Sequence, residues 1–201
     1  LSQGKSGQSM GGMIAQETIE IAKKITETQA KIKSDVVLQR PNAGEGSAEG
    51  SDERSSEKFE TIRAALSQEI LEGLAEVEQD GDSVIIRLGQ QDSFGSGSSD
   101  LQGSFSNTLS RVGNALGQTG GTIRVEGHTD NVPIAFSERF KSNWDLSSAR
   151  SASVANYLLD NTQVEPGRVT ITGFADSKPI ADNSSSEGRA KNRRIEVIVD
   201  G

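Results

Sequence analysis

The chain has 201 residues, of which 32% are hydrophobic and 25% charged, and its formal net charge is -8 at pH 7. This length fits one domain of ordinary size with extensions, and the negative charge argues against nucleic-acid binding, which needs a basic face. The chain has no cysteine and one histidine, His128. These counts exclude disulfides, thiolate metal sites and any zinc site built from several histidines of one chain.

No apolar run approaches the roughly 20 residues that a membrane-spanning helix needs, and no signal-peptide pattern is visible. The chain begins at Leu1 rather than at a methionine. We therefore expect an excised fragment, and a membrane segment upstream of it is compatible with the sequence.

Residues 1–57 are predicted to form a linker that contains one helical segment. Residues 1–12 and 40–57 are rich in glycine and serine, a composition typical of flexible connections. Between them, residues 13–37 carry a heptad-like seam of Ile14, Thr18, Ile21, Ile25, Thr28 and Ile32. The threonines weaken this seam, so a marginal coiled coil and a solvated, partly formed helix both remain open.

Residues 58–201 are predicted to form the compact domain, with three amphipathic helices. The first is expected over residues 58–77, and the second from about Asp100, which is a good N-cap. The third begins at Ser142 or Asn143 and runs to about Asp160.

Four short runs rich in β-branched residues predict strands at 83–88, 122–126, 169–174 and 194–199. A turn at 79–82 and polar loops connect the elements, with a helical turn near 185–189. This order predicts an α+β fold, in which a helix layer packs on one face of a small mixed sheet.

The third predicted helix carries an arginine within its apolar stripe. Residues four apart share a helix face, so Arg150 lines up with Leu146, Val154 and Leu158. An unpaired buried charge is very costly, so this guanidinium must reach water or meet an anion. Asp130, in the loop before the helix, is the candidate partner.

Two interpretations of this pair remain open from the residues alone. In the first, Asp130 binds an ammonium and Arg150 a carboxylate of one zwitterionic ligand, with neutral hydrogen bonds from Thr129, Asn143 and Ser147. In the second, Asp130 and Arg150 form an internal ion pair and Asn143 caps the helix.

Other polar residues near these elements have simpler interpretations. His128 lacks a neighbouring nucleophile, which favours a structural role at the strand end over a general base. Gly127 and Gly173 end strands and are assigned to backbone geometry. A cluster of polar and basic residues lies just before and at the start of the last predicted strand. It is either exposed to solvent there or part of the pocket of Arg150. Its members are Arg189, Asn192, Arg193 and Arg194.

Three blocks of the sequence resemble the OmpA-like peptidoglycan-binding domain, over roughly residues 83–200. The first is Gly127-His128-Thr129-Asp130. The second runs from Asn143 through Leu146, Ser147 and Arg150 to Val154. The third comprises Gly173-Phe174 and the stretches 179–183 and 187–196. Within the family, the long loop before Asn143 and the preceding linker are most similar to flagellar stator B subunits of the MotB and PomB type, nearest to sodium-driven PomB.

The resemblance implies a non-catalytic binder of the peptide stem of peptidoglycan. Family members hold the ammonium and carboxylate of diaminopimelate with the aspartate and arginine that match Asp130 and Arg150. The other residues of the predicted site are Thr129, Asn143, Leu146, Ser147 and Arg194. No cofactor or metal is expected. The departure is the lengthened loop at 131–142, which we expect to cover or reshape the pocket.

The resemblance further implies a periplasmic anchor that fixes the ion-driven stator to the cell wall around the flagellar rotor, in a protein held in the inner membrane by a segment absent here. Its expected partners are a second copy in a homodimer, the stator A subunit and periplasmic flagellar ring proteins, without nucleic acid. The linker is expected to extend on activation. The alternative is an outer-membrane-associated tether of the OmpA or Pal kind. An enzyme would need a metal set or a nucleophile with its base, and the sequence presents neither.

Overall fold

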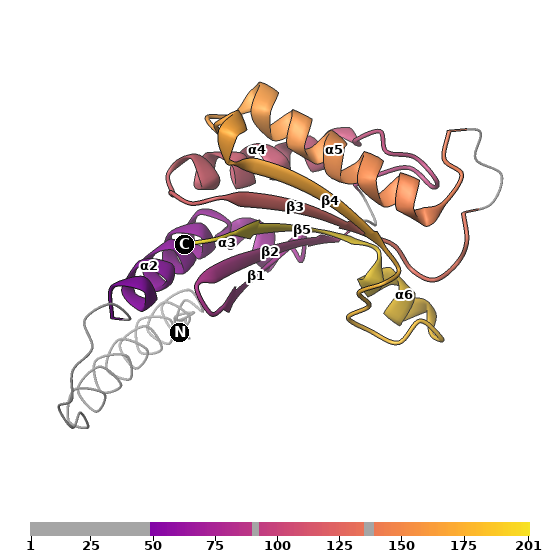
Figure 1. Cartoon of the computed structure of the whole chain (residues 1–201), viewed down its shortest axis with the longest axis horizontal. Coiled ribbons are helices and arrows are strands. Elements are labelled where there is room, and N and C mark those ends of the chain that lie inside the picture. The colour runs from indigo at the N-terminus through magenta and orange to yellow at the C-terminus, as the bar shows by residue number, and fades with distance from the viewer. Residues whose placement is uncertain (1–48, 90–92, 135–138) are drawn as a thin grey trace, which may run out of the picture. The chain divides into compact units, whose positions relative to one another are not determined.

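The structure is a computed structural model that describes residues 49–89, 93–134 and 139–201 (Figure 1). The heptad-like segment predicted at 13–37 lies outside these residues. Within the three described stretches, no helix combines the length and the apolar character needed to cross a membrane.

One mixed sheet of five strands forms the framework, in the order β1-β2-β5-β3-β4. β1 (Ala75–Asp80), β2 (Ser83–Gly89), β5 (Arg194–Val199) and β3 (Ile123–His128) pair antiparallel in turn. β4 (Val169–Ala175) pairs parallel to β3 at the edge of the sheet. The C-terminal end of β3 therefore lies beside the start of β5 and the end of β4.

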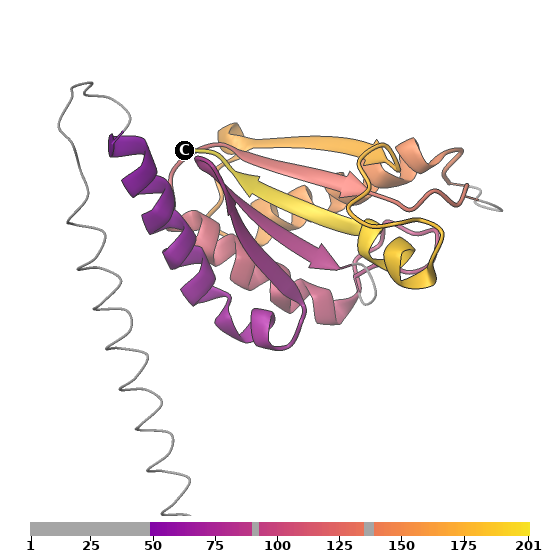
Figure 2. The same cartoon turned by 90° about the horizontal axis from the view of Figure 1, so that it is seen from below.

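Three helices cover one face of this sheet (Figures 1 and 2). They are α2 (Glu49–Ala65), α4 (Gly103–Gly117) and α5 (Asn143–Asn161). The shorter α3 (Ser67–Leu71), η1 (Pro166–Arg168) and α6 (Ser186–Asn192) lie in the connections. The predicted α+β fold, with helices on one face of a mixed sheet, is confirmed.

The core lies between the sheet and the helix layer. Alternate residues of β2 and β5 point into it, and the apolar stripe of α4 meets them as predicted. These side chains, each at most 6% exposed, are Val84, Ile86, Leu88, Ile195, Val197, Val199, Phe105, Leu109, Val112 and Leu116. Burying each large side chain contributes about 1.5–3 kcal/mol, so this layer fixes the sheet against the helices.

The helix predicted over 58–77 is wrong at both ends. It begins at Glu49, inside the expected linker, and breaks into α2 and α3. Gly73, with a φ of 70°, then turns the chain, and the amide of Leu74 donates to the carbonyl of Glu69 at 2.8 Å. The next residues form β1, an edge strand that the sequence did not reveal, so the sheet has five strands rather than four.

The predicted cap of the second helix is also wrong. α4 begins at Gly103, with Gln102 at the N-cap position and no side-chain cap bond. The Asp100 carboxylate instead accepts hydrogen bonds from Arg139 at 2.9 Å and from Ser98 at 2.9 Å. Asp100 thus closes a loop rather than opening a helix.

Candidate functional site

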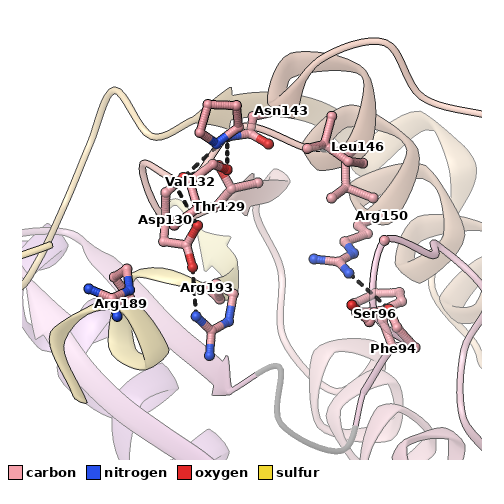
Figure 3. Close-up of a pocket in the computed structure, with 14 residues that line it drawn as sticks. Phe94, Ser96, Thr129, Asp130, Val132, Asn143, Leu146, Arg150, Arg189 and Arg193 are labelled. Atoms are coloured by element: carbon pink, nitrogen blue, oxygen red, sulfur yellow. Dashed lines mark hydrogen bonds and ion pairs between the residues drawn. The ribbon is translucent and has the colours of Figure 1, made fainter. Parts of the chain in front are cut away.

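A cavity of about 650 Å³ opens at the C-terminal end of β3 (Figure 3). Four segments that are distant in the sequence line it: the loop before α4, the loop after β3, the first half of α5, and α6 with the residue that follows it. The lining residues are Phe94 to Gly97, Thr129, Asp130, Val132 to Ile134, Asn143, Leu146, Arg150, Arg189 and Arg193.

Asp130 is placed by the end of β3. The amide of the preceding Thr129 donates to the carbonyl of Ala175 at 2.8 Å, which ties the loop to β4. One Asp130 carboxylate oxygen accepts from the amide of Val132 at 3.0 Å. The other accepts from Nη1 of Arg193 at 2.6 Å. Because β3 and β5 are antiparallel neighbours, Arg193, just before β5, reaches Asp130, the second residue after β3.

α5 lies unusually close to the sheet, and two glycines permit this. A Cβ at Gly127 would be 2.3 Å from the carbonyl oxygen of Ser147, and one at Gly173 would be 2.2 Å from Oγ of Ser148. Ser151 adds a hydrogen bond of 3.0 Å to the carbonyl of Thr172 on β4. The glycines predicted to serve backbone geometry thus serve close packing, which fixes the helix that carries Arg150.

Arg150 is held in one orientation by the loop before α4. Its side chain is buried, with the residue 5% exposed. Nε donates to the carbonyl of Ser98 at 2.8 Å, and Nη2 to that of Gly95 at 3.2 Å. The guanidinium carbon lies 5.0 Å from the centre of the Phe94 ring, a cation–π contact. These contacts preorganise the guanidinium at the wall of the cavity.

The electrostatics of Arg150 reflect this position. Its pKa is lowered to about 10, first by burial and then by the positive charge of Arg193, while Asp130 acts in the opposite direction. The group is therefore still charged at neutral pH. Both members of the Asp130–Arg193 ion pair therefore act on the charge of Arg150.

An internal ion pair between Asp130 and Arg150, one of the two interpretations open from the sequence, is not the pairing that the structure shows. Asp130 is paired with Arg193, and Arg150 with backbone carbonyls and Phe94. Asp130 and Arg150 nevertheless line the same cavity, and Figure 3 shows Arg150 facing Asp130 and Arg193 across it. The cavity thus has an acidic and a basic group on opposite walls.

Three other predicted site residues border the cavity. The hydroxyl of Thr129 donates to the carbonyl of Asp130 at 2.9 Å, and the side-chain Nδ2 of Asn143 donates to the carbonyl of Val132 at 3.0 Å. Asn143 therefore pins the loop after β3, while Ser142 caps α5 by accepting from the amide of Asp145. Leu146 supplies an apolar wall. From the long loop at 131–142, the described residues Val132 to Ile134 form a side of the cavity.

The remaining two predicted residues do not line the cavity. Ser147 is fully buried between α5 and β4, where its hydroxyl accepts from the amide of Ala175 at 3.1 Å. Arg194 is buried on the other face of the sheet and donates to Glu196 at 2.7 Å. Both side chains hold the scaffold beneath the site.

Sequence reasoning left one half of the basic wall unassigned. The sequence left two interpretations open for Arg189 and Arg193: exposure to solvent at the start of the last strand, or a place in the pocket of Arg150. The structure supports the second, because both side chains line the cavity. Phe94 was missed, although it is the one large apolar residue in its glycine- and serine-rich loop, a usable signal.

Comparison with known proteins shows the family to which a chain with this cavity belongs. The family model described as "OmpA family" matches residues 93–193, which include every lining residue of the cavity. The chain belongs to the OmpA family. This confirms the resemblance expected from the three sequence blocks.

Relatives of this OmpA-family chain include Motility protein B of Bacillus subtilis, 43% identical over 77 residues, which are 38% of this chain and 29% of that protein. A cell wall anchor of the T6SS from Pseudomonas aeruginosa has 36% identity and a TM-score of 0.66, covering 70% of this chain and 96% of the other. A putative MotB like protein from Desulfovibrio vulgaris has 27% identity and a TM-score of 0.71, covering 76% and 94%. The chain spans under a third of the length of its Bacillus relative.

A second polar cluster lies on the face of the sheet that the helices do not cover. Potential ligand atoms of Glu126, His128 and Glu196 lie within 4.8 Å of one another, all buried. Glu196 is already bonded to Arg87 at 3.0 Å and to Arg194 at 2.7 Å. A metal ion would have to compete with these guanidiniums, so the cluster is better explained as an internal charge network that supports the end of β3.

Proposed function

We propose that this chain is a non-catalytic domain that binds the peptide stem of peptidoglycan in the cavity at the end of β3. One observation carries the proposal: a carboxylate and a guanidinium, Asp130 and Arg150, lie on opposite walls of one cavity of about 650 Å³. Diaminopimelate carries an ammonium and a carboxylate on the same carbon, so its free end complements such a pair.

The two groups are suited to different parts of this ligand. Arg150 presents a planar donor fork whose orientation is fixed before binding, which lowers the entropic cost of gripping a carboxylate. Asp130 accepts the ammonium. Leu146, Phe94 and Val132 line the cavity with apolar surface on which the methylene groups of the ligand pack.

The test is binding of the purified chain to isolated cell-wall sacculi, with Arg150→Ala against Arg63→Ala. Both variants lose one guanidinium, but Arg63 lies on α2 and is not among the cavity residues. Losing a charged hydrogen-bonding group costs about 1.5–3 kcal/mol, so we expect Arg150→Ala to weaken binding at least about tenfold. Arg63→Ala should bind as the parent does. Equal retention of all three proteins on sacculi would refute the proposed site.

At a finer level, we propose that the chain is the periplasmic part of a flagellar stator B subunit, of the sodium-driven PomB type. The similarity to Motility protein B and to a putative MotB like protein supports the assignment to a stator B subunit. The proposal includes a homodimer, anchoring in the inner membrane by a segment outside this chain, and contacts with the stator A subunit and periplasmic flagellar ring proteins. The region before the domain would extend when the stator engages.

A wall tether outside the flagellum is the second candidate, because a T6SS cell wall anchor has 36% identity and a TM-score of 0.66. This includes an outer-membrane-associated tether of the OmpA or Pal kind. The sequence that precedes Leu1 in the full protein separates the candidates. An apolar span containing an aspartate supports the stator, whereas a lipidated cysteine or a barrel supports the tether.

A further inference from the structure

The cavity carries more positive charge than a simple zwitterion can neutralise. Its titratable lining residues are Asp130, Arg150, Arg189 and Arg193, so three positive charges face one negative charge, a formal net charge of +2. A ligand with one ammonium and one carboxylate brings no net charge into this space. Most of the basic excess would then remain without an anion.

Arg189 and Arg193 supply this excess from α6 and the residue after it (Figure 3). Nη1 of Arg189 donates to the carbonyls of Asn183 at 2.8 Å and Ser184 at 3.1 Å. These acceptors orient the guanidinium, but being neutral they do not cancel its charge. Glu187 of the same helix interacts with Arg189 electrostatically, but its side chain is exposed and does not line the cavity. Arg193 is paired with Asp130.

The Asp130–Arg193 pair is built to exchange. The Arg193 side chain is 37% exposed, whereas that of Asp130 is 12% exposed. The guanidinium can therefore leave for water at a small desolvation cost, while the carboxylate stays in the cavity wall and keeps its need for a cation. A ligand ammonium that binds Asp130 competes directly with Arg193, because both need the same carboxylate. Once displaced, Arg193 would be a guanidinium at the cavity mouth beside two other guanidiniums, and it would need a new anion.

We propose that the cavity selects peptide stems that carry a further free carboxylate, and that Arg193 moves from Asp130 to this carboxylate when the ligand binds. This inference rests on the function proposed above. The free end of diaminopimelate would occupy Asp130 and Arg150, and a second carboxylate of the stem would meet Arg193, with Arg189 adding its charge. An acetylated Ala-γ-Glu-diaminopimelate tripeptide has one ammonium and three carboxylates, which balances the charge of the cavity.

Amidation of the stem is the chemical change to which such a cavity responds. It replaces a carboxylate by a neutral amide without altering the shape of the peptide. The probes are therefore N-acetyl-L-alanyl-γ-D-glutamyl-meso-diaminopimelate and the same tripeptide amidated at the glutamyl carboxylate and at the diaminopimelate carboxylate of the main chain. Both probes keep the ammonium and carboxylate at the far end of diaminopimelate.

The experiment is isothermal titration calorimetry of both peptides against the full chain at low, constant ionic strength. We expect the unamidated peptide to bind about tenfold more tightly, which corresponds to roughly one charge-assisted contact, about 1.4 kcal/mol. In Arg193→Gln this preference should fall below about threefold, and Arg193→Lys, which keeps the charge, should restore most of it.

Lys191→Gln is the matched control, since Lys191 is an exposed cation in the last turn of α6, two residues before Arg193, and does not line the cavity. It removes the same formal charge and should keep the tenfold preference. Equal affinity of the parent chain for both peptides, or an unchanged preference in Arg193→Gln, overturns the selection by Arg193 while the proposed function stands. If the parent chain binds neither peptide, the proposed function fails together with this inference.

Discussion

Mild acid is expected to destabilise the domain through His128, the only histidine of the chain. The residue is 1% exposed and stacks on Phe174, with ring centres 5.4 Å apart. Its pKa is lowered from 6.5 to about 4, first by burial and then by Arg194, with Lys178 acting in the same direction and Glu196 opposing.

The sign and size of the effect follow from linkage. Below pH 6.5 the unfolded chain takes up a proton on His128, whereas the folded chain does not until about pH 4. The unfolding free energy therefore falls as the pH drops through this window. Relative to pH 7, the loss reaches about 2 kcal/mol at pH 5 and about 3 kcal/mol when the whole window is crossed.

The measurement is urea unfolding at pH 7 and pH 5 with constant ionic strength, for the parent chain and for His128→Gln. Glu196 contributes little to the change between pH 7 and pH 5. Burial alone would raise the pKa of Glu196, but its hydrogen bonds to Arg194 and Arg87 lower this pKa below the ordinary 4.5, so the stability that its charge provides is lost only at more acid pH. The variant has no imidazole to protonate, so its unfolding free energy should fall by less than about 0.5 kcal/mol between pH 7 and pH 5. If parent and variant lose the same unfolding free energy, the reasoning about His128 is wrong.

Two further predictions concern the scaffold and the assembly. Gly127→Ala places a Cβ 2.3 Å from the carbonyl oxygen of Ser147, so it should lower the unfolding free energy by about 1–3 kcal/mol in urea unfolding. Gly120→Ala, with no atom within 4 Å of the added Cβ, is the neutral control, and equal stabilities would contradict the close-packing argument. Light scattering should give the chain the mass of a dimer, twice its 21.3 kDa. The double variant Ile21→Glu, Ile25→Glu should have the mass of a monomer, because it places two charges in the heptad-like seam that we expect to mediate pairing. A parent chain that is monomeric at high concentration would contradict the dimer.

The element that carries the site could be predicted because local and long-range signals agree there. Ser142 is a good cap, and the stripe of α5 repeats every fourth residue from Leu146 to Leu158. The same stripe revealed Arg150 as a charge among apolar neighbours. The strand predicted at 122–126 is found as β3, which continues two residues further to His128, and Asp130 lies in the loop after it as predicted.

β1 was missed because its sequence supports two periodicities. Val77 continues the helical spacing of Ile70 and Leu74, while its alternation with Glu76 and Glu78 suits an edge strand. Pairing with β2 decides between them, and this long-range contact is invisible in a short window. Gly73 was the local signal that the helix had ended.

The partner of Asp130 was beyond sequence reasoning for a topological reason. Arg193 lies 63 residues after Asp130, and only the antiparallel placement of β5 beside β3 brings them together. Arg150 is nearer in the sequence and was the natural choice. Its actual partners come from a glycine- and serine-rich loop whose backbone carbonyls no residue pattern identifies.

Arg150 and Arg193, which face each other across the cavity, differ in how firmly their side chains are held, and this difference sets their roles. Arg150 is buried and fixed by two carbonyls and an aromatic ring before any ligand arrives, so it can act as a rigid anchor. Arg193 is more exposed and held by one ion pair that a ligand ammonium can replace. The loop that supports α6 is itself anchored, because the side-chain oxygen of the buried Asn192 accepts from the amides of Ile180 and Ala181 at 2.8 and 2.9 Å. Ligand binding can therefore exchange the Arg193 contact by a side-chain movement while the backbone around the cavity stays in place.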